Sequence, residues 1–294
     1  MKNFNQNLKI KEIKNDLFNS KKIQVFIKRE DLINDFISGN KYRKLKYNIN
    51  NAVLYYNQIL SFGGAHSNHL YSLSYLGLIN KIKTIGVVRG NTLTPTIKYC
   101  KSNNMKIVNL NYSDYRDRYK KNTIDMLRDK FGDFFYLPEG GTNEMAVKGC
   151  EEIIDERCYS FDYVCCCVGT GGTVSGILRS VKQHQKVIGF SVLKKNTSIL
   201  ENICKYSKIN NFSLNENYSF GGIGKYNVDL INFMNYFFQH YDIKLDHIYN
   251  SKMFFGVFDL AKKNFFKKNS KILVLNTGGL NGLSGLNDNN LLYV

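Results

Sequence analysis

Short apolar stretches alternate with longer amphipathic ones along most of the 294-residue chain. Apolar runs bounded by polar turns are typical of strands, and they occur at 25–31, 58–63, 82–88, 106–110, 134–137, 163–168, 186–192 and 271–275. Segments with helical spacing lie between them, at 68–78, 94–103, 118–131, 143–157, 172–184 and 228–241. This alternation predicts an α/β fold with parallel sheets and crossover helices. Ligands of such folds bind beyond the carboxyl ends of the strands, where loops enter helices.

One such loop is the run Ser38-Gly39-Asn40-Lys41-Tyr42-Arg43-Lys44, which follows the first predicted strand. A helix is predicted after Lys41, because apolar or aromatic residues recur at Tyr42, Leu45 and Ile49. A lysine at a helix start can form an imine with an aldehyde, provided that burial or nearby cations keep part of its amine unprotonated. On its own, the run favours a simpler interpretation, a solvated basic helix face.

A second loop, Ser61-Phe62-Gly63-Gly64-Ala65-His66-Ser67-Asn68-His69, joins a strand end to a helix start. Ser67 or Asn68 can cap that helix with a side-chain oxygen. Free amides and hydroxyls at the same helix entrance can also hold a carboxylate or another anion. The residues leave both roles open, and one Ser-Asn pair can fill both.

The third loop follows the buried run 163–168 and consists of Gly169, Thr170, Gly171, Gly172 and Thr173. Glycines let successive backbone N–H groups converge, threonine hydroxyls add donors, and the dipole of the following helix favours an anion. These features predict a phosphate-binding cup, and the alternative is a tight turn with glycines used only for packing. NAD is disfavoured because a dinucleotide fingerprint needs glycine three residues beyond Gly171, where the chain has valine, and no Walker motif occurs.

Two further polar glycine loops have the same style. One is Pro138-Glu139-Gly140-Gly141-Thr142-Asn143, and the other is Thr277-Gly278-Gly279 after the strand predicted at 271–275. Several such loops in one parallel α/β chain predict a single cleft where polar backbone converges on a ligand. Together with a lysine and a phosphate cup, they indicate pyridoxal 5′-phosphate as the cofactor.

Composition excludes several other classes of protein. Hydrophobic residues make up 43% of the chain, which is typical of globular proteins. The chain has no stretch of about 18 apolar residues, so no membrane-spanning helix is expected. The first residues lack the apolar core of a secretory signal, so we expect a cytoplasmic protein. Seven cysteines without a C-x-x-C pair predict reduced, mostly buried thiols rather than a zinc site or disulfides. The net charge of +17 raises nucleic acid as a partner, but the lysines are dispersed and no nucleic-acid-binding motif occurs.

From residue 28 to residue 285 the chain resembles the 1-aminocyclopropane-1-carboxylate deaminase/D-cysteine desulfhydrase family. The resemblance rests on the five loops above and on Arg29-Glu30-Asp31. It implies a two-domain, tryptophan-synthase-β-like fold (fold type II) with open parallel-rich sheets flanked by helices. Residues 1–44 and 158–294 would form a large cofactor-binding domain, and residues 45–157 a small α/β domain inserted into it. It also implies a homodimer.

The resemblance implies roles for the cofactor site. Lys41 would form the Schiff base with pyridoxal 5′-phosphate, and Lys44 would support the phosphate. Asn68 would hydrogen-bond the cofactor's 3′-oxygen. The loop from Gly169 to Thr173 would cradle the phosphate, with Gly169, Thr170, Gly171, Gly172 and Thr173 all counted as cofactor-binding residues.

The resemblance also implies a substrate site for a small amino acid. The carboxylate of that substrate would be held by Ser67 and by the backbone of Asn68 and His69. Tyr249 would lie over the substrate, and Lys41, Ser67 and Tyr249 would be the catalytic residues.

Two departures from the family pattern affect the expected reaction. Ring-opening deaminases carry a glutamate at the position of Asn250, paired with the pyridine nitrogen, and an amide cannot supply that negative charge. Desulfhydrase-like members carry a neutral residue there and a threonine where this chain has Thr277, so Asn250 and Thr277 are expected beside the cofactor. The family's second catalytic tyrosine aligns with Ile223, which cannot transfer a proton, and Tyr226 is three residues away.

The resulting prediction is a pyridoxal-phosphate lyase or deaminase that removes the Cα proton of a small amino acid. β-Elimination then releases ammonia and a keto acid, as in D-cysteine desulfhydrases. Two alternatives stay open: 1-aminocyclopropane-1-carboxylate deamination to 2-oxobutanoate and ammonia, and a cofactor-binding protein with degenerate catalysis. The sequence leaves the substrate and its chirality undetermined.

Overall fold

Strands and helices alternate through the computed structural model, which describes residue 4 and residues 8–194, 198–286 and 290–293. The strands are β1 (Ile10–Glu12), β2 (Gln24–Arg29), β3 (Gln58–Gly63), β4 (Lys83–Arg89), β5 (Lys106–Leu110), β6 (Phe135–Leu137), β7 (Tyr163–Val168), β8 (Lys186–Ser191), β9 (Phe212–Asn215) and β10 (Lys271–Asn276). The helices are α1 (Asp16–Ser20), α2 (Gly39–Tyr55), α3 (Asn68–Ile79), α4 (Pro95–Ser102), α5 (Tyr112–Arg116), α6 (Lys121–Phe131), α7 (Glu144–Glu151), α8 (Gly172–Ser180), α9 (Ser198–Tyr206), α10 (Val228–Tyr241) and α11 (Asn250–Lys262). Short 3-10 turns are η1 (Glu30–Ile33), η2 (Glu139–Gly141), η3 (Glu156–Cys158) and η4 (Leu280–Gly285).

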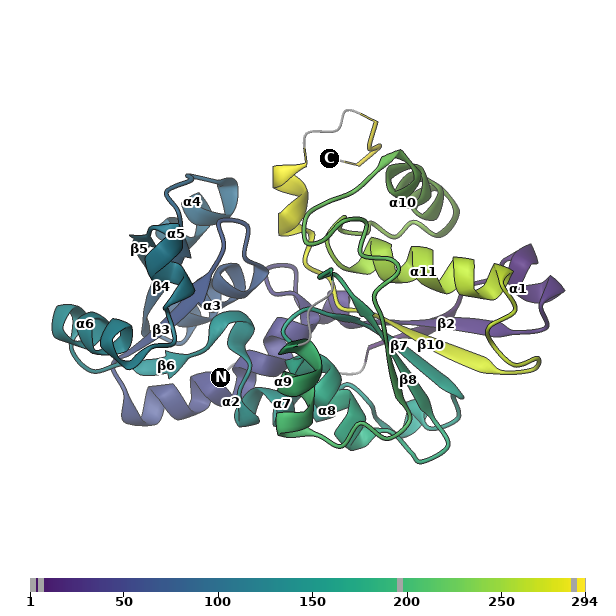
Figure 1. Cartoon of the computed structure of the whole chain (residues 1–294), viewed down its shortest axis with the longest axis horizontal. Helices are drawn as coiled ribbons and strands as arrows, with labels where there is room; N and C mark the ends of the chain where they lie inside the picture. The colour runs from purple at the N-terminus through teal and green to yellow at the C-terminus, as the bar shows by residue number, and fades with distance from the viewer. Residues whose placement is uncertain (1–3, 5–7, 195–197, 287–289, 294) are drawn as a thin grey trace.

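The described strands form two sheets, which lie on opposite sides of Figure 1. The larger sheet has the order β1-β2-β10-β7-β8-β9, and the smaller has the order β5-β4-β3-β6. Among these strands only the β1–β2 pair is antiparallel. The carboxyl ends of β2, β10 and β7 therefore meet at one edge of the larger sheet, where the predicted functional loops begin.

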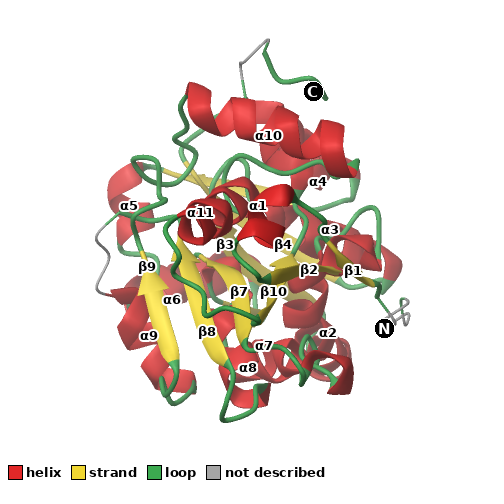
Figure 2. Ribbon diagram, turned by 90° about the vertical axis from the view of Figure 1, so that its right-hand side faces the viewer, coloured by secondary structure: helices red, strands yellow, loops and turns green. Residues whose placement is uncertain are grey.

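The larger sheet is buried on both faces, as Figure 2 shows for its two helix layers. Side chains alternate along a strand, so Cys165 and Cys167 of β7 pack on one face with Phe254 of α11. Cys166 packs on the other face with Ile177 of α8. Burial on both sides explains why β7 is a continuous apolar run rather than an alternating one. Of the seven free cysteines, all but Cys204 are buried, which confirms that expectation.

The smaller sheet is covered by α2, α3 and α4 on one face and by α5 and α6 on the other. Helix α2 leaves the edge of the larger sheet and packs against this second core, so it connects the two halves of the molecule. All strands of the smaller sheet lie within residues 45–157. We therefore propose that residues 1–44 and 158–294 together form one domain and that residues 45–157 form the other. No helix in the described part of the chain is long and apolar enough to cross a bilayer.

The expected elements match the structure closely where the apolar pattern is clean. Seven predicted strands agree within one residue, and the eighth, 25–31, gives way to η1 after Arg29. Three helices are shorter than predicted, at 118–131, 143–157 and 172–184. For example, α8 ends at Ser180, whose hydroxyl donates back to the carbonyl oxygen of Gly176. Helix α11 was not predicted, because it is buried on nearly every face and has no clear polar side.

Candidate functional site

Loops that follow five different strands meet around the first turn of α2. The loop after β2 leads into Lys41 and Lys44, and the loop after β3 leads into Ser67. The loops after β6, β7 and β10 carry Gly140, Thr170 and Thr277, in that order. The parallel sheets thus deliver all the predicted polar loops to one place.

Lys44 is the residue that ties these loops together. Its Nζ atom lies 2.6 Å from the carbonyl oxygen of Gly140, 2.8 Å from Oγ1 of Thr142 and 3.4 Å from Oγ1 of Thr170. The side chain is 1% exposed. Burial, together with the nearby Lys41, lowers the pKa of Lys44 to about 7. An anion bound here would therefore also stabilise the charged form of this amine.

Lys41 lies one turn earlier in α2 and has a different environment. Its side chain makes no hydrogen bond or ion pair with the described residues, although burial lowers its pKa to about 8. The surrounding protein penalises the charged form, while the side chain keeps partial exposure to solvent. An accessible amine with a lowered pKa and no partner is suited to nucleophilic or proton-transfer chemistry.

The loop between β7 and α8 forms a cup at a helix N-terminus. Gly171, with φ of +89°, is the N-cap of α8, a left-handed conformation that favours glycine. Thr170 Oγ1 lies 2.7 Å from Thr142 Oγ1, and Thr173 Oγ1 accepts a hydrogen bond from Asn40. Hydroxyls, free helix N–H groups and Lys44 therefore surround one point, as an anion site requires.

The start of α3 shows the capping role that the sequence left open, while the anion-binding role stays a prediction. Ser67 caps the helix, because its Oγ accepts the N–H of Leu70 at 3.2 Å. Asn68 donates to the carbonyl oxygen of Gly279 at 3.1 Å, while its Oδ1 is buried without a partner. His69 is turned towards the core, where its Nε2 pairs with Ser61 Oγ at 2.8 Å. Burial, with Lys41 and Lys44 nearby, holds the pKa of His69 well below its usual value, so its ring is uncharged.

Tyr249, Asn250 and Thr277 lie on the opposite wall of the site. A Cβ atom added to Gly169 would lie 3.4 Å from the ring of Tyr249, so that ring covers the start of the cup. Burial raises the pKa of Tyr249, and the phenol keeps its proton. Asn250 Oδ1 accepts from the backbone N–H of Thr277 at 3.2 Å and from its hydroxyl at 3.4 Å.

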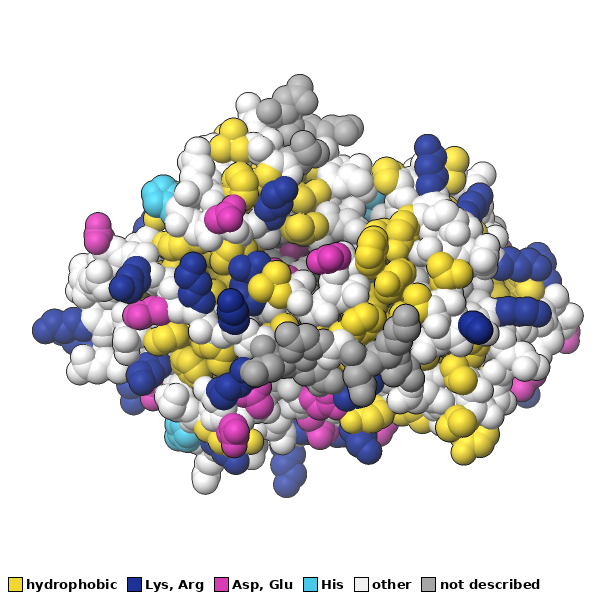
Figure 3. All heavy atoms as spheres, turned by 180° about the vertical axis from the view of Figure 1, so that it is seen from behind, with side chains coloured by type: hydrophobic (Ala, Val, Ile, Leu, Met, Phe, Trp, Pro, Cys, Tyr) yellow, Lys and Arg dark blue, Asp and Glu magenta, His cyan; other side chains and the backbone are white. Residues whose placement is uncertain are grey.

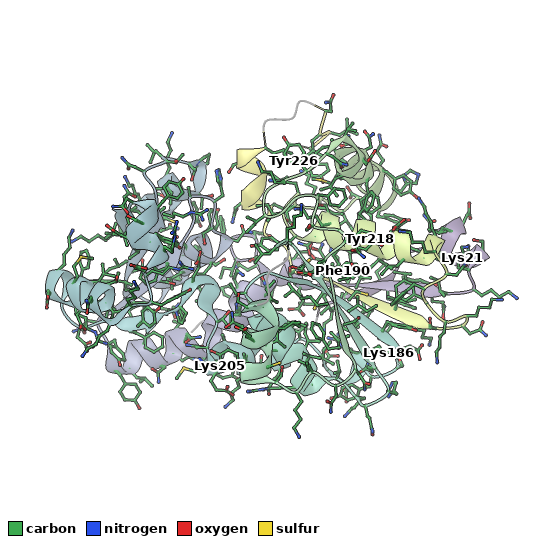
Figure 4. The ribbon with its side chains drawn as sticks, viewed as in Figure 1. Lys21, Lys186, Phe190, Lys205, Tyr218 and Tyr226 are labelled. Atoms are coloured by element: carbon green, nitrogen blue, oxygen red, sulfur yellow. The ribbon has the colours of Figure 1, made fainter. Side chains whose placement is uncertain are left out.

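Ile223 and Tyr226 lie apart from this cluster. The side chain of Ile223 is 52% exposed. Tyr226, labelled in Figure 4, packs against an apolar cluster that includes Leu283 of η4, and its ring meets that of His247 edge-on at 5.6 Å. Tyr226 is therefore held by apolar residues of α10 and of the carboxy-terminal segment.

Three contributors to the site were not predicted from the sequence. Thr142 contacts both Lys44 and Thr170, Ser61 fixes the ring of His69, and Asp246 binds Asn250. The sequence indicates the loop containing Thr142 through its glycines, and a hydroxyl residue beside them is typical of an anion-binding loop. No local sequence pattern predicts the contacts that Ser61 and Asp246 make.

A second hollow, separate from the site around Lys41, lies next to the loop that contains Gly278. It is a cavity of about 360 Å³ lined by residues that include Asp31, Ser38, Asn250 and Leu280. Figure 3 shows the molecule from behind, where the surface is hollowed near the middle and acidic side chains gather beside the hollow. This cavity does not reach Lys41 or the phosphate cup.

The residues at the meeting point of the loops fit pyridoxal 5′-phosphate. A Cβ atom on Gly172 would lie 2.7 Å from Thr142 Oγ1 and 3.0 Å from Lys44 Cε, so the cup has no room for a side chain there. Lys44 and the threonines would hold the phosphate, and the unpartnered Oδ1 of Asn68 shows that its side chain has spare hydrogen-bonding capacity for the ring. Lys41 supplies the amine that an aldehyde cofactor needs.

Comparisons with known proteins agree with this geometry. Residues 13–278 match the family described as "Pyridoxal-phosphate dependent enzyme". A Pyrococcus furiosus protein named "Putative 1-aminocyclopropane-1-carboxylate deaminase" is 27% identical over 92% of this chain and 89% of its own length. The 1-aminocyclopropane-1-carboxylate deaminase of Rhizobium leguminosarum bv. viciae is 23% identical over 90% of this chain and 88% of its own.

Solved structures show the same fold. A crystal structure described as an "ACC deaminase homologue" has a TM-score of 0.82 and 23% identity, and covers 96% of this chain and 92% of its own. A hydrogen sulfide-producing enzyme from Fusobacterium nucleatum has a TM-score of 0.64 and 20% identity, with coverage of 94% and 96%. The predicted α/β fold, the resemblance and the predicted cofactor are thereby confirmed. The chain belongs to the family of pyridoxal-phosphate dependent enzymes.

Proposed function

We propose that this enzyme removes the Cα proton of a small amino acid and eliminates a β-substituent, releasing ammonia and a keto acid. The observation that carries the proposal is the unpartnered Lys41 amine, with its pKa lowered to about 8, one helical turn from the phosphate cup at Lys44. A neutral amine at this place can both exchange with a substrate amine and accept a proton.

Each wall of the site has a proposed role. The hydroxyl of Ser67 and the backbone N–H groups of Asn68 and His69 bind the substrate carboxylate at the start of α3. Lys44 and the loop from Gly169 to Thr173 bind the cofactor phosphate. Pyridoxal phosphate supplies an electron sink for the charge that develops at Cα. Lys41 removes the Cα proton, and the ring of Tyr249 covers the substrate and excludes water.

We propose a thiolate as the leaving group, as in a D-cysteine desulfhydrase. A thiol has a pKa of about 8.5, so it departs as an anion without an acid to protonate it. Opening a cyclopropane ring instead requires a proton on carbon, and the position of the family's second tyrosine is held by Ile223, which is half exposed and apolar. This difference favours β-elimination, and the names of the curated relatives make cyclopropane opening the second candidate.

A substrate panel tests the proposal. The holoprotein is assayed for keto acid, ammonia and sulfide with D-cysteine, L-cysteine and 1-aminocyclopropane-1-carboxylate. We expect sulfide and pyruvate from D-cysteine, and no product from any substrate with Lys41→Ala. 2-Oxobutanoate from the cyclopropane amino acid alone would establish the second candidate. Cofactor uptake without turnover of any substrate on a broad panel would establish a degenerate binding protein.

We also propose that the protein is a cytoplasmic homodimer. The rim of the second cavity carries exposed Leu32 (53%), Phe36 (47%) and Leu280 (40%), an apolar surface suited to a second copy. Sedimentation should give a dimer, and Phe36→Asp should shift it towards the monomer. A monomeric wild-type protein would exclude this part of the proposal.

A further inference from the structure

The side-chain amide of Asn250 has one possible orientation. Its Nδ2 donates to Asp246 Oδ2 at 2.7 Å and to the carbonyl oxygen of Gly278 at 3.0 Å. Its Oδ1 accepts from the backbone N–H and the hydroxyl of Thr277. A flipped amide would place its NH₂ against a backbone N–H and its oxygen against a carboxylate and a carbonyl. The oxygen of Asn250 therefore faces Thr277.

Asp246 is a fully buried carboxylate surrounded by donors. Its side chain accepts from the backbone N–H groups of Ile248, Tyr249 and Asn250, and from Asn250 Nδ2. A protonated carboxyl would need an acceptor for its own hydrogen, and none of its hydrogen-bond partners among the described residues is one. Burial raises the pKa of Asp246 and these hydrogen bonds oppose that shift. The geometry is that of the ionised form.

A buried amine also interacts electrostatically with this carboxylate. Lys252, 1% exposed, lies in α11, the helix that starts four residues after Asp246, and its Nζ donates to the carbonyl oxygens of Ser219 and Gly222 at 2.8 and 2.7 Å. Asp246 favours the charged form of Lys252, although burial lowers the pKa of that lysine to about 8. The four hydrogen bonds that Asp246 accepts, together with the attraction to Lys252, explain how an ionised carboxylate persists in the interior.

These contacts form a line of polarised groups from Asp246 to Thr277. Because the carboxylate of Asp246 accepts from the NH₂ group of Asn250, it shifts electron density of that amide onto the amide oxygen. That oxygen accepts the single hydrogen of the Thr277 hydroxyl. A hydroxyl that has donated its hydrogen can only accept at its remaining face. We propose that Asp246, acting through Asn250 and Thr277, holds a proton on the ring nitrogen of the cofactor.

This inference rests on the proposed function and on the expectation, implied by the family resemblance, that Thr277 lies beside the cofactor ring. It changes the interpretation of Asn250. The amide itself carries no charge, but a full negative charge lies one hydrogen bond behind it. Asp246 is thus a positioning residue that restores what the absent glutamate would supply. The competing interpretation is that Asp246 only caps the start of α11.

Ring-¹⁵N-labelled pyridoxal phosphate, bound to the protein without substrate, tests the inference by NMR. The ¹⁵N resonance distinguishes a protonated ring nitrogen from an unprotonated one. We expect the protonated resonance in the wild type at neutral pH, and its loss in Asp246→Asn and in Thr277→Val. Ser251→Ala is the matched control, because the buried Ser251 Oγ has no hydrogen-bond partner, and it should keep the wild-type resonance.

The outcomes separate this inference from the proposed function. An unprotonated nitrogen in the wild type, or a protonated one in either Asp246→Asn or Thr277→Val, would overturn it. If Asp246→Asn fails to fold because the cap is lost, Thr277→Val alone decides the result. A wild-type protein that takes up no cofactor would overturn the proposed function, and this inference with it.

Discussion

Arg43, in the first turns of α2 and close to Lys41 in the sequence, forms a buried ion pair with Glu30 of η1. Nε of Arg43 lies 3.1 Å from Oε2 of Glu30, and the two side chains are 1% and 0% exposed. A Cβ atom on Gly39 would lie 2.1 Å from the carbonyl oxygen of Glu30, so the first turn of α2 packs against the backbone of η1. This contact fixes the direction in which α2 starts, and with it the position of Lys41.

Replacing Glu30 with glutamine should destabilise the protein strongly. The guanidinium of Arg43 would stay buried after losing its nearest carboxylate, and breaking a buried pair costs about 3 kcal/mol. Urea denaturation of the apoprotein measures the free energy of unfolding. The control is Asp117→Asn, which breaks the exposed Lys120–Asp117 pair and should change stability by less than about 1 kcal/mol. Equal effects of the two variants would contradict this account of α2.

The strand ends and glycine loops could be predicted because they depend on local patterns. The continuous apolar run 163–168 predicts a strand that ends where polar residues begin, and a glycine such as Gly171 indicates a backbone position that can adopt the left-handed conformation. Parallel topology then places the loops together without any knowledge of side-chain contacts. This much of the fold and of the cofactor site follows from the sequence.

Contacts between distant residues could not be predicted in this way. Lys44 and Thr142 are 98 positions apart, and no periodicity links them. Asp246 is only four positions from Asn250, but nothing in the sequence shows that its carboxylate accepts a hydrogen bond from the Asn250 side chain. Burial hid α11 for a similar reason, since a helix surrounded by protein has no polar face to reveal its period.

Lys41 should be the most reactive lysine of the apoprotein towards a small aldehyde at a pH of about 8, because Lys44 and Lys252, whose pKa values are also lowered, are each only 1% exposed. With a pKa of about 8, about half of its amines are neutral at that pH, whereas an ordinary lysine, with a pKa of about 10.4, is less than about 1% neutral. Reductive trapping followed by peptide mapping should find most of the label on Lys41. Exposed Lys120 provides the comparison within the same digest. Uniform labelling of all lysines would show that the amine of Lys41 is not activated.

The apoprotein should become more stable as the pH rises from about 7 to about 8.5. Lys44 has a folded-state pKa of about 7, below its unfolded value, so the unfolded chain binds more protons in this range. The contribution to the free energy of unfolding is about 1 kcal/mol per pH unit, and it is lost below the folded pKa. Lys44→Met should flatten the slope by that amount. An unchanged slope in the variant would show that Lys44 stays charged in the folded apoprotein.

Gly172→Ala should weaken cofactor binding without preventing folding. The new methyl group would meet Thr142 Oγ1 and Lys44 Cε, so both must move away from the phosphate cup. Displacing a charge-assisted contact costs about 1.4 kcal/mol, which corresponds to about tenfold in the dissociation constant. Titration of the apoprotein with pyridoxal phosphate, followed by absorbance, measures the change. Gly64→Ala is the matched control, because a Cβ there meets no atom within 4 Å, and its affinity should equal that of the wild type. Wild-type affinity in Gly172→Ala would place the phosphate elsewhere.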